Sequence, residues 1–443
     1  MTDIKRIVEN PELYKELVKQ KNINLDIDEL LKLYEERKAL TTEVEQLRKE
    51  RNDNVDEIKK VSGKPPADLV EKGKSIKAKI TEAEAKLAEI EAKYDELIWY
   101  TPMFISEDTP VGKDDSENVE LRRWSPEGGE GGDPAKPSFE QRDHIQLGEE
   151  LNLLDLERGV KTGGFRGYYL KNEGALMHMG LMMYGLKLMQ SKGFETFVPP
   201  TIVKQDALYG SGHMPFDLAN IYVVDSLGHV KEEEGREDKD KKYLIGTAEP
   251  SLLNYHRDEV LSEDQLPVKY AGFSQCYRSE IGSYGKDTRG IYRIHEFMKI
   301  EQVVICKNDI EESTKMHDMM VSYSEELLQA LKLPYRVLQI CTGDMGAGKY
   351  RMFDLETWMP SRNGYGETHS ASNLLDWQTR RLNLRVKGKD GKNYYPYALN
   401  NTVVASPRIL IAIWENYQNE DGSITVPEVL REYVGKDKIE PRA

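Results

Sequence analysis

Cysteine is scarce in this chain of 443 residues, which contains only Cys276, Cys306 and Cys341. The number is odd and the spacings match no metal-ligand pattern, so we expect neither a disulfide framework nor a cysteine-held zinc ion. No apolar run approaches the roughly 18 residues that a membrane-spanning helix needs. The first residues also lack the apolar centre of a signal peptide. We therefore expect a cytoplasmic protein without a membrane segment.

Two common phosphate-binding motifs are missing as well. The sequence has no Gly-x-x-x-x-Gly-Lys-Ser/Thr loop and no strand-linked Gly-x-Gly-x-x-Gly. An overall basic character is also absent, because the formal net charge is −15. Indiscriminate nucleic-acid binding needs a basic surface and is therefore not expected. Any nucleotide or nucleic acid must be recognised by local groups of residues.

The N-terminal part predicts a long helical hairpin. Apolar residues recur at spacings of three and four from about residue 26 to Ile58, and again from Leu69 to Leu97. Gly63, Pro65 and Pro66 must interrupt the helix between these runs. The pattern predicts an antiparallel coiled coil over about 26–98, roughly 50 Å long at 1.5 Å per residue.

The distal half of this hairpin is predicted to be basic, although the proximal half is acidic. A charge run is usually only a solvated face, and a hairpin of this kind often serves as a spacer or dimerisation arm. A basic tip on an acidic protein nevertheless favours contact with nucleic-acid phosphates. The basic residues are Arg48, Lys49, Arg51, Lys59, Lys60, Lys64, Lys72, Lys74, Lys77 and Lys79.

The rest of the chain predicts a linker and one large domain. Glycine and proline gather at 125–137, so we expect a linker over 111–137 and a domain over 138–443. Helices are predicted at 143–154, 175–192, 309–331 and 409–417, and a charged surface insertion at 231–242. Strands and helices do not alternate as βαβ units. We therefore expect an α+β domain with a mixed, mainly antiparallel sheet flanked by helices.

Residues 276–303 hold the densest group of charged residues and glycines. A strand is predicted to end near Tyr277 and another to resume at Ile291, with three glycines in the loop between them. Loops of this length in a compact domain are usually functional. Arginine suits phosphate binding because its planar fork can hold two oxygens. The charged residues are Arg278, Glu280, Lys286, Arg289 and Arg293.

Two further segments place special residues at strand ends. Pro199 and Pro200 close one strand, and Arg408 follows another strand at the start of a helix, where Pro407 is well tolerated. Two arginines on different elements, with acids to hold a metal ion, are what triphosphate handling requires.

These segments resemble the three motifs of class II aminoacyl-tRNA synthetases, and the chain is most similar to the seryl-tRNA synthetase family along nearly its whole length. The most specific matches are Thr247-Ala248-Glu249, Tyr277-Arg278-Ser279-Glu280, Asp287-Thr288-Arg289-Gly290, His295-Glu296-Phe297, Thr342-Gly343-Asp344-Met345-Gly346, Asp354-Leu355-Glu356-Thr357-Trp358 and Trp377-Gln378-Thr379-Arg380-Arg381. The resemblance implies activation of L-serine with ATP to seryl-adenylate, followed by transfer to the 3′ end of tRNA(Ser).

The resemblance also implies site residues. Arg278 and Arg408 are expected to be catalytic, and Glu367 and Ser370 to hold Mg²⁺, with Glu356 as a further carboxylate. The expected serine-binding residues are Thr247, Ala248, Glu249, Arg278, Glu301, Asn400 and Thr402. The expected ATP-binding residues are Arg278, Ser279, Glu280, Arg293, Ile294, Phe297, Glu356, Glu367, Thr368, His369, Ser370 and Arg408.

The hairpin acquires a role through the same resemblance. Residues 1–110 are expected to form a tRNA-binding domain whose arm grips tRNA(Ser) by shape and phosphates, in a homodimer. The loop 282–290 is expected to meet the acceptor end of the tRNA. His369 and Ala371 stand where the family usually has serine and cysteine, and Asn400-Asn401-Thr402 departs from the glycine-rich bacterial form.

Two alternatives stay open on the residues alone. A related enzyme could load an amino acid onto a carrier protein, although the intact hairpin argues against this. A non-catalytic coiled-coil scaffold is the other alternative, and the presence of Arg278, Glu280 and Arg408 argues against it.

Overall fold

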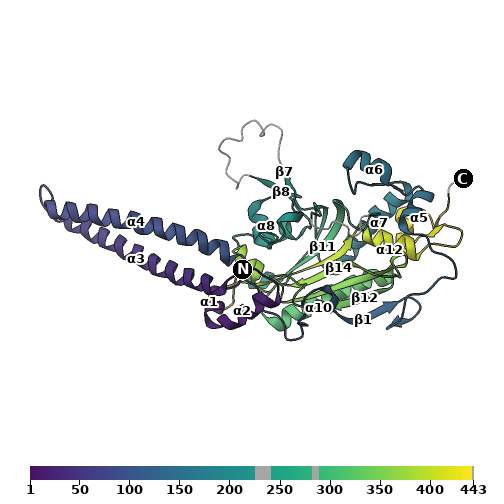
Figure 1. Ribbon diagram of the computed structural model, residues 1–443, viewed down its shortest axis with the longest axis horizontal. Helices are drawn as coiled ribbons and strands as arrows, with labels where there is room; N and C mark the ends of the chain where they lie inside the picture. Colours follow the sequence, from purple (N-terminus) through teal and green to yellow (C-terminus); the bar gives the residue numbers. More distant parts are fainter. Residues whose placement is uncertain (225–240, 282–288, 442–443) are drawn as a thin grey trace. The chain divides into compact units, whose positions relative to one another are not determined.

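The computed structural model describes residues 1–224, 241–281 and 289–441 (Figure 1). The chain divides into two compact units, Met1–Pro102 and Met103–Ala443. The predicted insertion at 231–242 and the predicted loop at 282–290 lie outside the described residues except at their ends. Across the described ranges, no helix has both the length and the apolar character needed to cross a membrane.

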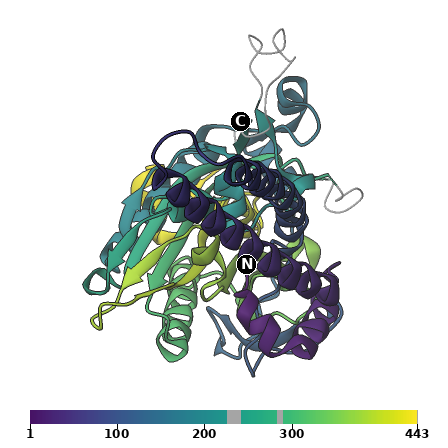
Figure 2. The ribbon, with the colours of Figure 1, turned by 90° about the vertical axis from the view of Figure 1, so that its left-hand side faces the viewer.

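The first unit confirms the helical hairpin. Helices α1 (Ile4–Glu9) and α2 (Pro11–Gln20) precede α3 (Ile27–Lys59) and α4 (Ala67–Ile98), which run side by side (Figures 1 and 2). Asp26 caps α3 by accepting hydrogen bonds from the backbone nitrogens of Asp28 and Glu29 at 2.9 and 3.1 Å. The glycine and prolines at 63–66 separate the two helices, as the inability of proline to continue a helix requires.

The seam between α3 and α4 follows the predicted pattern over most of its length. Its buried cluster consists of Val44, Leu47, Ile76, Ile80 and Ala83. Near the tip, the regular apolar spacing is interrupted, because Val55 is 42% exposed and the polar residue Asn54 is buried. The Asn54 Nδ2 atom donates to Leu69 O at 3.2 Å, and it packs closely on Gly73, where a Cβ atom would lie 3.0 Å from it.

The second unit is built on a nine-stranded sheet. Its strands are, in spatial order, β2 (Gly129–Glu130), β1 (Val119–Ser125), β12 (Tyr335–Gln339), β13 (Arg351–Met359), β14 (Gly364–Asn373), β17 (Tyr397–Ala405), β11 (Glu296–Cys306), β10 (Val268–Tyr277) and β5 (Glu195–Phe197). Every neighbouring pair is antiparallel except β5 and β10. The predicted α+β class with a mainly antiparallel sheet is therefore confirmed. Residues 119–130, placed in the linker from sequence, form the edge strands β1 and β2.

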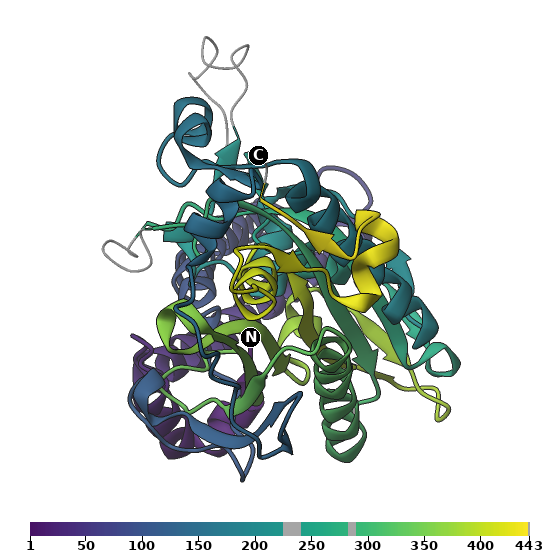
Figure 3. The ribbon, with the colours of Figure 1, turned by 90° about the vertical axis from the view of Figure 1, so that its right-hand side faces the viewer.

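Two long helices cover one face of this sheet (Figure 3). Helix α7 (Asn172–Ser191) presents Gly185 to Ile300 of β11, and α10 (Ile310–Ala330) accepts a hydrogen bond from Asn401 of β17 through Met320 O at 2.9 Å. Successive side chains of a strand point to opposite faces. Lys299 and Glu301, which flank Ile300, therefore point to the other face.

Two local predictions differ from the structure. The helix predicted at 143–154 is α5 (His144–Glu150), because Asn152 adopts a left-handed φ of 56° and the chain then forms β3 (Leu154–Asp155). The strand predicted from Ile291 begins at Glu296 instead. The Ile291 nitrogen donates to His144 Nε2 and the Tyr292 carbonyl accepts from Arg408, so this backbone does not pair in the sheet.

Candidate active site

Two adjoining pockets open on the face of the sheet that carries Lys299 and Glu301. The Arg408 pocket spans about 500 Å³ and the Glu249 pocket about 1120 Å³, and both volumes include space open to solvent. The residues shared by the two linings are Arg278, Lys299, Glu367 and Thr402. The two pockets therefore form one continuous site with two chemically different halves.

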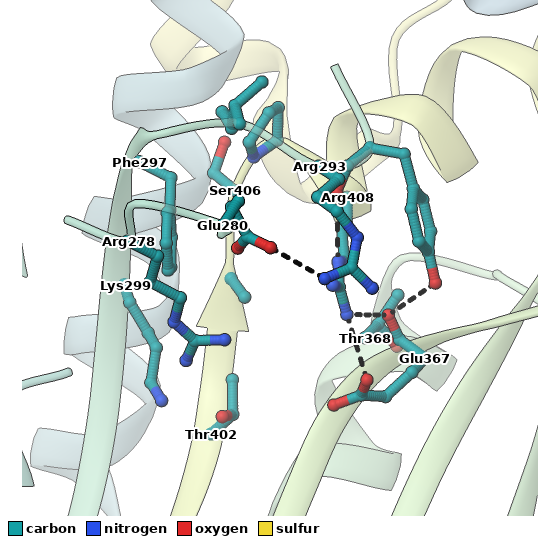
Figure 4. Close-up of a pocket in the computed structure, with 14 residues that line it drawn as sticks. Arg278, Glu280, Arg293, Phe297, Lys299, Glu367, Thr368, Thr402, Ser406 and Arg408 are labelled. Atoms are coloured by element: carbon teal, nitrogen blue, oxygen red, sulfur yellow. Dashed lines mark hydrogen bonds and ion pairs between the residues drawn. The ribbon is translucent and has the colours of Figure 1, made fainter. Parts of the chain in front are cut away.

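The Arg408 pocket combines cationic groups with an aromatic wall (Figure 4). The Arg278 guanidinium carbon lies 5.3 Å from the centroid of the Phe297 ring, and its Nε and Nη2 atoms face Gly246 O at 3.4 Å. On the other side, Arg408 Nη1 donates to Glu367 Oε2 at 3.2 Å and to Glu367 O at 2.9 Å. A planar, aromatic, polyanionic ligand suits such a lining.

Glu280 and Arg293 close the same pocket. Arg293 Nη1 donates to Glu280 Oε2 at 2.7 Å. Glu280 also has a φ of 54°, in the left-handed region that a non-glycine residue adopts only at a cost. The hydrogen bond from Arg293 holds the Glu280 carboxylate in the pocket lining and helps to offset this strain.

The Glu249 pocket is lined by buried acids and amides. Glu249 Oε1 accepts from Gln378 Nε2 at 2.5 Å and from Asn400 Nδ2 at 2.7 Å. Glu301 Oε2 lies 2.5 Å from Lys299 Nζ. The other oxygen of Glu249, Oε2, lies 4.0 Å from His213 Nε2, which also lines this pocket.

The local electrostatics differ between the two halves. Burial raises the pKa of both Glu249 and Glu301, and Lys299 partly opposes that rise for Glu301. Burial also acts on Glu367, but the charges of Arg408 and Arg278 outweigh it and hold the pKa of Glu367 below its ordinary value. A ligand ammonium would therefore find stabilising carboxylates in the Glu249 pocket, and phosphates would find arginines in the Arg408 pocket.

Most residues predicted from sequence meet in these two linings. The Arg408 pocket contains Arg278, Glu280, Arg293, Ile294, Phe297, Glu367, Thr368, Thr402 and Arg408. The Glu249 pocket contains Thr247, Glu249, Arg278, Glu301, Glu367, Ser370, Asn400 and Thr402. The predicted residues outside both linings are Ala248, Ser279, Glu356 and His369.

Each of these four outlying residues has other contacts in the structure. Ala248 is fully buried, and Ser279 donates through its hydroxyl to Ala219 O. Glu356 accepts from Arg336 Nε at 2.6 Å. His369 is buried between Thr368 Oγ1 and Val403 O, each 2.9 Å from a ring nitrogen, and burial lowers its pKa to about 4.

Several lining residues were not singled out from the sequence. Lys299 lies two residues after Phe297 on β11, so both side chains lie on the same face of the strand. This alternation could have predicted Lys299 as a pocket residue from the sequence. No local pattern marks His213 or Lys349, which reach the Glu249 pocket from separate segments. Gln378 belongs to the matched motif at 377–381, but no site role was predicted for it. Burial lowers the pKa of His213 to about 4, so its ring is neutral there.

Comparison with known proteins identifies the family. The model described as "Seryl-tRNA synthetase N-terminal domain" matches residues 1–104, and "tRNA synthetase class II core domain (G, H, P, S and T)" matches residues 229–417. The chain is 42% identical to the serine–tRNA ligase of Treponema denticola over 443 residues, which is 99% of this chain and 100% of that protein. The chain belongs to the seryl-tRNA synthetase family. The resemblance read from its motifs is therefore confirmed.

Other members of the family agree in sequence and in structure. The serine–tRNA ligase of Deinococcus radiodurans is 41% identical over 439 residues, 99% of each chain. The crystal structure of seryl-tRNA synthetase from Pyrococcus horikoshii, complexed with ATP, matches with a TM-score of 0.87 and 36% identity over all of both chains. The cytoplasmic serine–tRNA ligase of Naegleria fowleri, complexed with AMP, matches with a TM-score of 0.81 and 29% identity over 98% of this chain and 96% of that one. These relatives favour neither the carrier-protein alternative nor the scaffold alternative.

Proposed function

We propose that this protein is a serine–tRNA ligase, which activates L-serine with ATP and transfers it to the 3′ end of tRNA(Ser). The observation that carries the proposal is the continuous site in which Arg278 and Lys299 lie between an arginine-lined pocket and an acid-lined pocket. An enzyme that joins a triphosphate to a zwitterion needs both environments within reach of one another. The full-length similarity to serine–tRNA ligases supports the same substrates.

ATP is assigned to the Arg408 pocket. The family structure solved with ATP supports a nucleotide substrate. We assign Phe297 to adenine stacking, Glu280 to the adenine amino group and Arg278 to the α-phosphate. Arg408 is assigned to the γ-phosphate side and to the other face of adenine, and its start-of-helix position on α12 (Arg408–Asn416) supports an anion there.

Mg²⁺ is assigned to Glu367 and Ser370. Among the described residues, no group of three or more His, Cys, Asp or Glu side chains could hold a metal ion by itself, so the ATP phosphates must supply further ligands. Asp354 faces Ser370 across the β13–β14 pair, and its Oδ1 atom has no hydrogen-bond partner among the described residues. Burial and the charge of Glu367 raise the pKa of Asp354, so this carboxylate cluster fits a cation. When bound, Mg²⁺ would neutralise phosphate charge.

Serine is assigned to the Glu249 pocket. The buried carboxylates of Glu249 and Glu301 suit its ammonium and hydroxyl groups, and Thr247, Asn400 and Thr402 supply further polar contacts. A site that hydrogen-bonds a substrate hydroxyl strongly rejects analogues that lack it. The pocket therefore favours serine over alanine.

The reaction requires no nucleophile from the protein. The serine carboxylate attacks the α-phosphorus of ATP in line and pyrophosphate leaves. The 3′-terminal ribose hydroxyl of tRNA then attacks the carbonyl carbon of seryl-adenylate, and AMP leaves. Arg278 and Arg408 contribute positioning and neutralisation of charge in the transition state.

We assign different functions to the N-terminal and C-terminal parts of the chain. We assign residues 1–110, including the arm, to tRNA binding and residues 138–443 to catalysis. A homodimer is proposed from the family and from the apolar face that α7 exposes at Leu176, Met179 and Met183, which are 49%, 46% and 44% exposed. A second copy of this chain would cover that face.

Serine-dependent exchange of labelled pyrophosphate into ATP tests the proposed activity. We expect exchange with serine and Mg²⁺ and at least about a hundredfold less with alanine, whose missing hydroxyl would leave buried polar groups unpaired. Glycine, threonine and cysteine complete the panel. No exchange with any of these amino acids would refute the enzymatic proposal, and charging of tRNA(Ser) separates it from carrier-protein loading.

Lys299→Met is expected to shift the acid limb of serine kcat/KM to higher pH. Burial raises the pKa of Glu301, and the Lys299 ammonium opposes this rise from 2.5 Å. Without the cation the pKa rises further, so Glu301 is protonated, and serine binding is lost, at a higher pH. Exchange kinetics across the acidic range measure the shift. Lys315→Met, which removes an exposed lysine paired with Glu311, is the control, and an unchanged acid limb in Lys299→Met would contradict the assignment.

A further inference from the structure

A buried hydrogen-bond network lies behind the Arg408 pocket and is absent from both linings. Its centre is Glu415 on α12, whose side chain is fully buried. Glu415 Oε1 accepts from the backbone nitrogen of His144 at 3.0 Å and from Ser361 Oγ at 2.8 Å, and Oε2 accepts from the Ser361 nitrogen at 3.0 Å. His144 Nδ1 also lies 2.9 Å from Oε1. Removing any member would leave buried polar groups unpaired.

The network assigns one tautomer to His144. A carboxylate accepts hydrogen bonds, so the Nδ1 atom beside Glu415 must carry the proton and donate it. The Nε2 atom then has a free lone pair and accepts from the backbone nitrogen of Ile291 at 3.3 Å. Gly290 packs directly on this ring edge, since a Cβ atom there would lie 2.0 Å from Nε2.

The residue after Ile291 contacts the pocket arginine. The Tyr292 carbonyl accepts from Arg408 Nε at 3.2 Å, and the Arg408 guanidinium carbon lies 4.5 Å from the centroid of the Tyr292 ring. The Tyr292 hydroxyl donates to Glu367 O at 3.3 Å. Tyr292 therefore contacts both Arg408 and the Glu367 backbone, and it helps to orient the Arg408 side chain.

Glu415 supports Tyr292 by two routes. One route runs through His144 to the Ile291 backbone. The other runs through Ser361 to its neighbour Arg362, whose guanidinium carbon lies 4.3 Å from the centroid of the Tyr292 ring. Three segments far apart in the sequence thus converge on the residue that orients Arg408.

We propose that His144 and Glu415 are positioning residues for the nucleotide, which hold Tyr292 and, through it, Arg408 in the orientation that ATP requires. The proposal rests on the assigned ligase function. His144 and Glu415 lie in neither pocket lining, and Tyr292 lies only in that of the Arg408 pocket, so their loss should affect ATP use and leave serine use nearly unchanged. If these residues only stabilised the fold, their loss would reduce the fraction of active enzyme, and it would not change the KM for ATP more than the KM for serine.

The test compares His144→Leu with His144→Gln in pyrophosphate exchange by the full-length protein. Leucine removes both hydrogen bonds, so we expect KM for ATP to rise about tenfold to a hundredfold while KM for serine stays within about twofold. A glutamine amide can donate to Glu415 and accept from Ile291, so His144→Gln should restore most of the ATP affinity. Equal rises in both KM values, or no rise for ATP, would overturn the proposal.

Two further variants keep the test decisive. Should His144→Leu fail to fold, Gly290→Ala displaces the imidazole from the other side and must raise KM for ATP in the same way. His256→Leu is the matched control, because His256 lies between Glu259 and Tyr270, 2.7 and 2.6 Å from its ring nitrogens. It should lower the melting temperature without changing KM for ATP. Absence of exchange in the unmodified protein would refute the ligase function, whereas normal exchange with unaffected His144 variants would refute only the positioning role.

Discussion

Arg278→Ala is expected to lower serine-dependent pyrophosphate exchange by about a thousandfold or more. Arg278 lines both pockets and is the arginine that lies over the Phe297 ring. Its guanidinium can therefore meet the serine carboxylate and the α-phosphate, the two groups that react. Removal of one preorganised donor from a site of developing charge costs about 10²-fold to 10³-fold, and here a full charge is also removed.

The measurement needs two companion variants. Arg278→Lys keeps the charge but loses the planar fork, so we expect an intermediate defect. Arg122→Ala removes an arginine that pairs with Glu325 on the surface, and it should leave exchange unchanged. Near-normal exchange in Arg278→Ala, with an unchanged melting temperature, would show that the assigned role is wrong.

Replacement of residues 40–85 by a short Gly-Ser linker is expected to separate the two half-reactions. We expect this deletion to disturb the rest of the hairpin little, because the two ends to be joined, Ala39 and Lys86, line the same shallow hollow between α3 and α4. The ion pair between Arg37 and Glu91, at 3.2 Å, is retained in the remaining part of the hairpin. Pyrophosphate exchange should stay within about twofold of the full-length protein, since no residue of either pocket is removed. Charging of tRNA(Ser) at low tRNA concentration should fall about a hundredfold or more, because the proposed contacts between the arm and tRNA phosphates are removed.

Substitution of the lysines at the tip of the hairpin tests the proposed tRNA contact without removing the arm. Alanine at Lys59, Lys60, Lys74 and Lys77 should weaken tRNA binding and reduce its salt dependence by roughly one unit of slope for each phosphate that the variant no longer neutralises. Alanine at Lys86 and Lys93, which pair with Glu82 and Glu89 nearer the base, is the control of similar chemistry. An unchanged salt slope in the tip variant would remove the tip from the tRNA interface.

The elements predicted best are those with a long, regular pattern. The hairpin was predictable because its seam repeats over some seventy residues and because proline cannot continue a helix. The errors fall where tertiary contacts override local preference. Residues 291–295 read as a strand, but the Ile291 backbone binds His144 and the Tyr292 carbonyl binds Arg408. Residues 119–130 read as linker, yet strand β12 provides a pairing edge for them.

The candidate active site likewise contains residues that the sequence predicted and residues that only the tertiary structure places there. The sequence motifs predicted Arg278, Glu280, Phe297 and Arg408 as site residues, because the order of these motifs along the chain is characteristic of the family. His213 carries no such local pattern, and Gln378 lies in a matched motif that predicted no site role for it. Both reach the Glu249 pocket because the chain folds their segments beside it. The hydrogen bond between Gln378 and Glu249 joins positions 129 residues apart, a separation that periodicity cannot encode.

By itself, the sequence determined the helical hairpin, the mainly antiparallel class of the second unit and the set of charged residues that we propose bind two charged substrates. Hydrophobic spacing, breaker residues and side-chain chemistry are local properties, so they can be read without coordinates. Only the tertiary structure decided that Arg278 and Lys299 lie between two pockets and that Glu415 supports Tyr292 through His144 and Ser361. These arrangements depend on strand register and burial, which bring together side chains from distant segments and alter their charge.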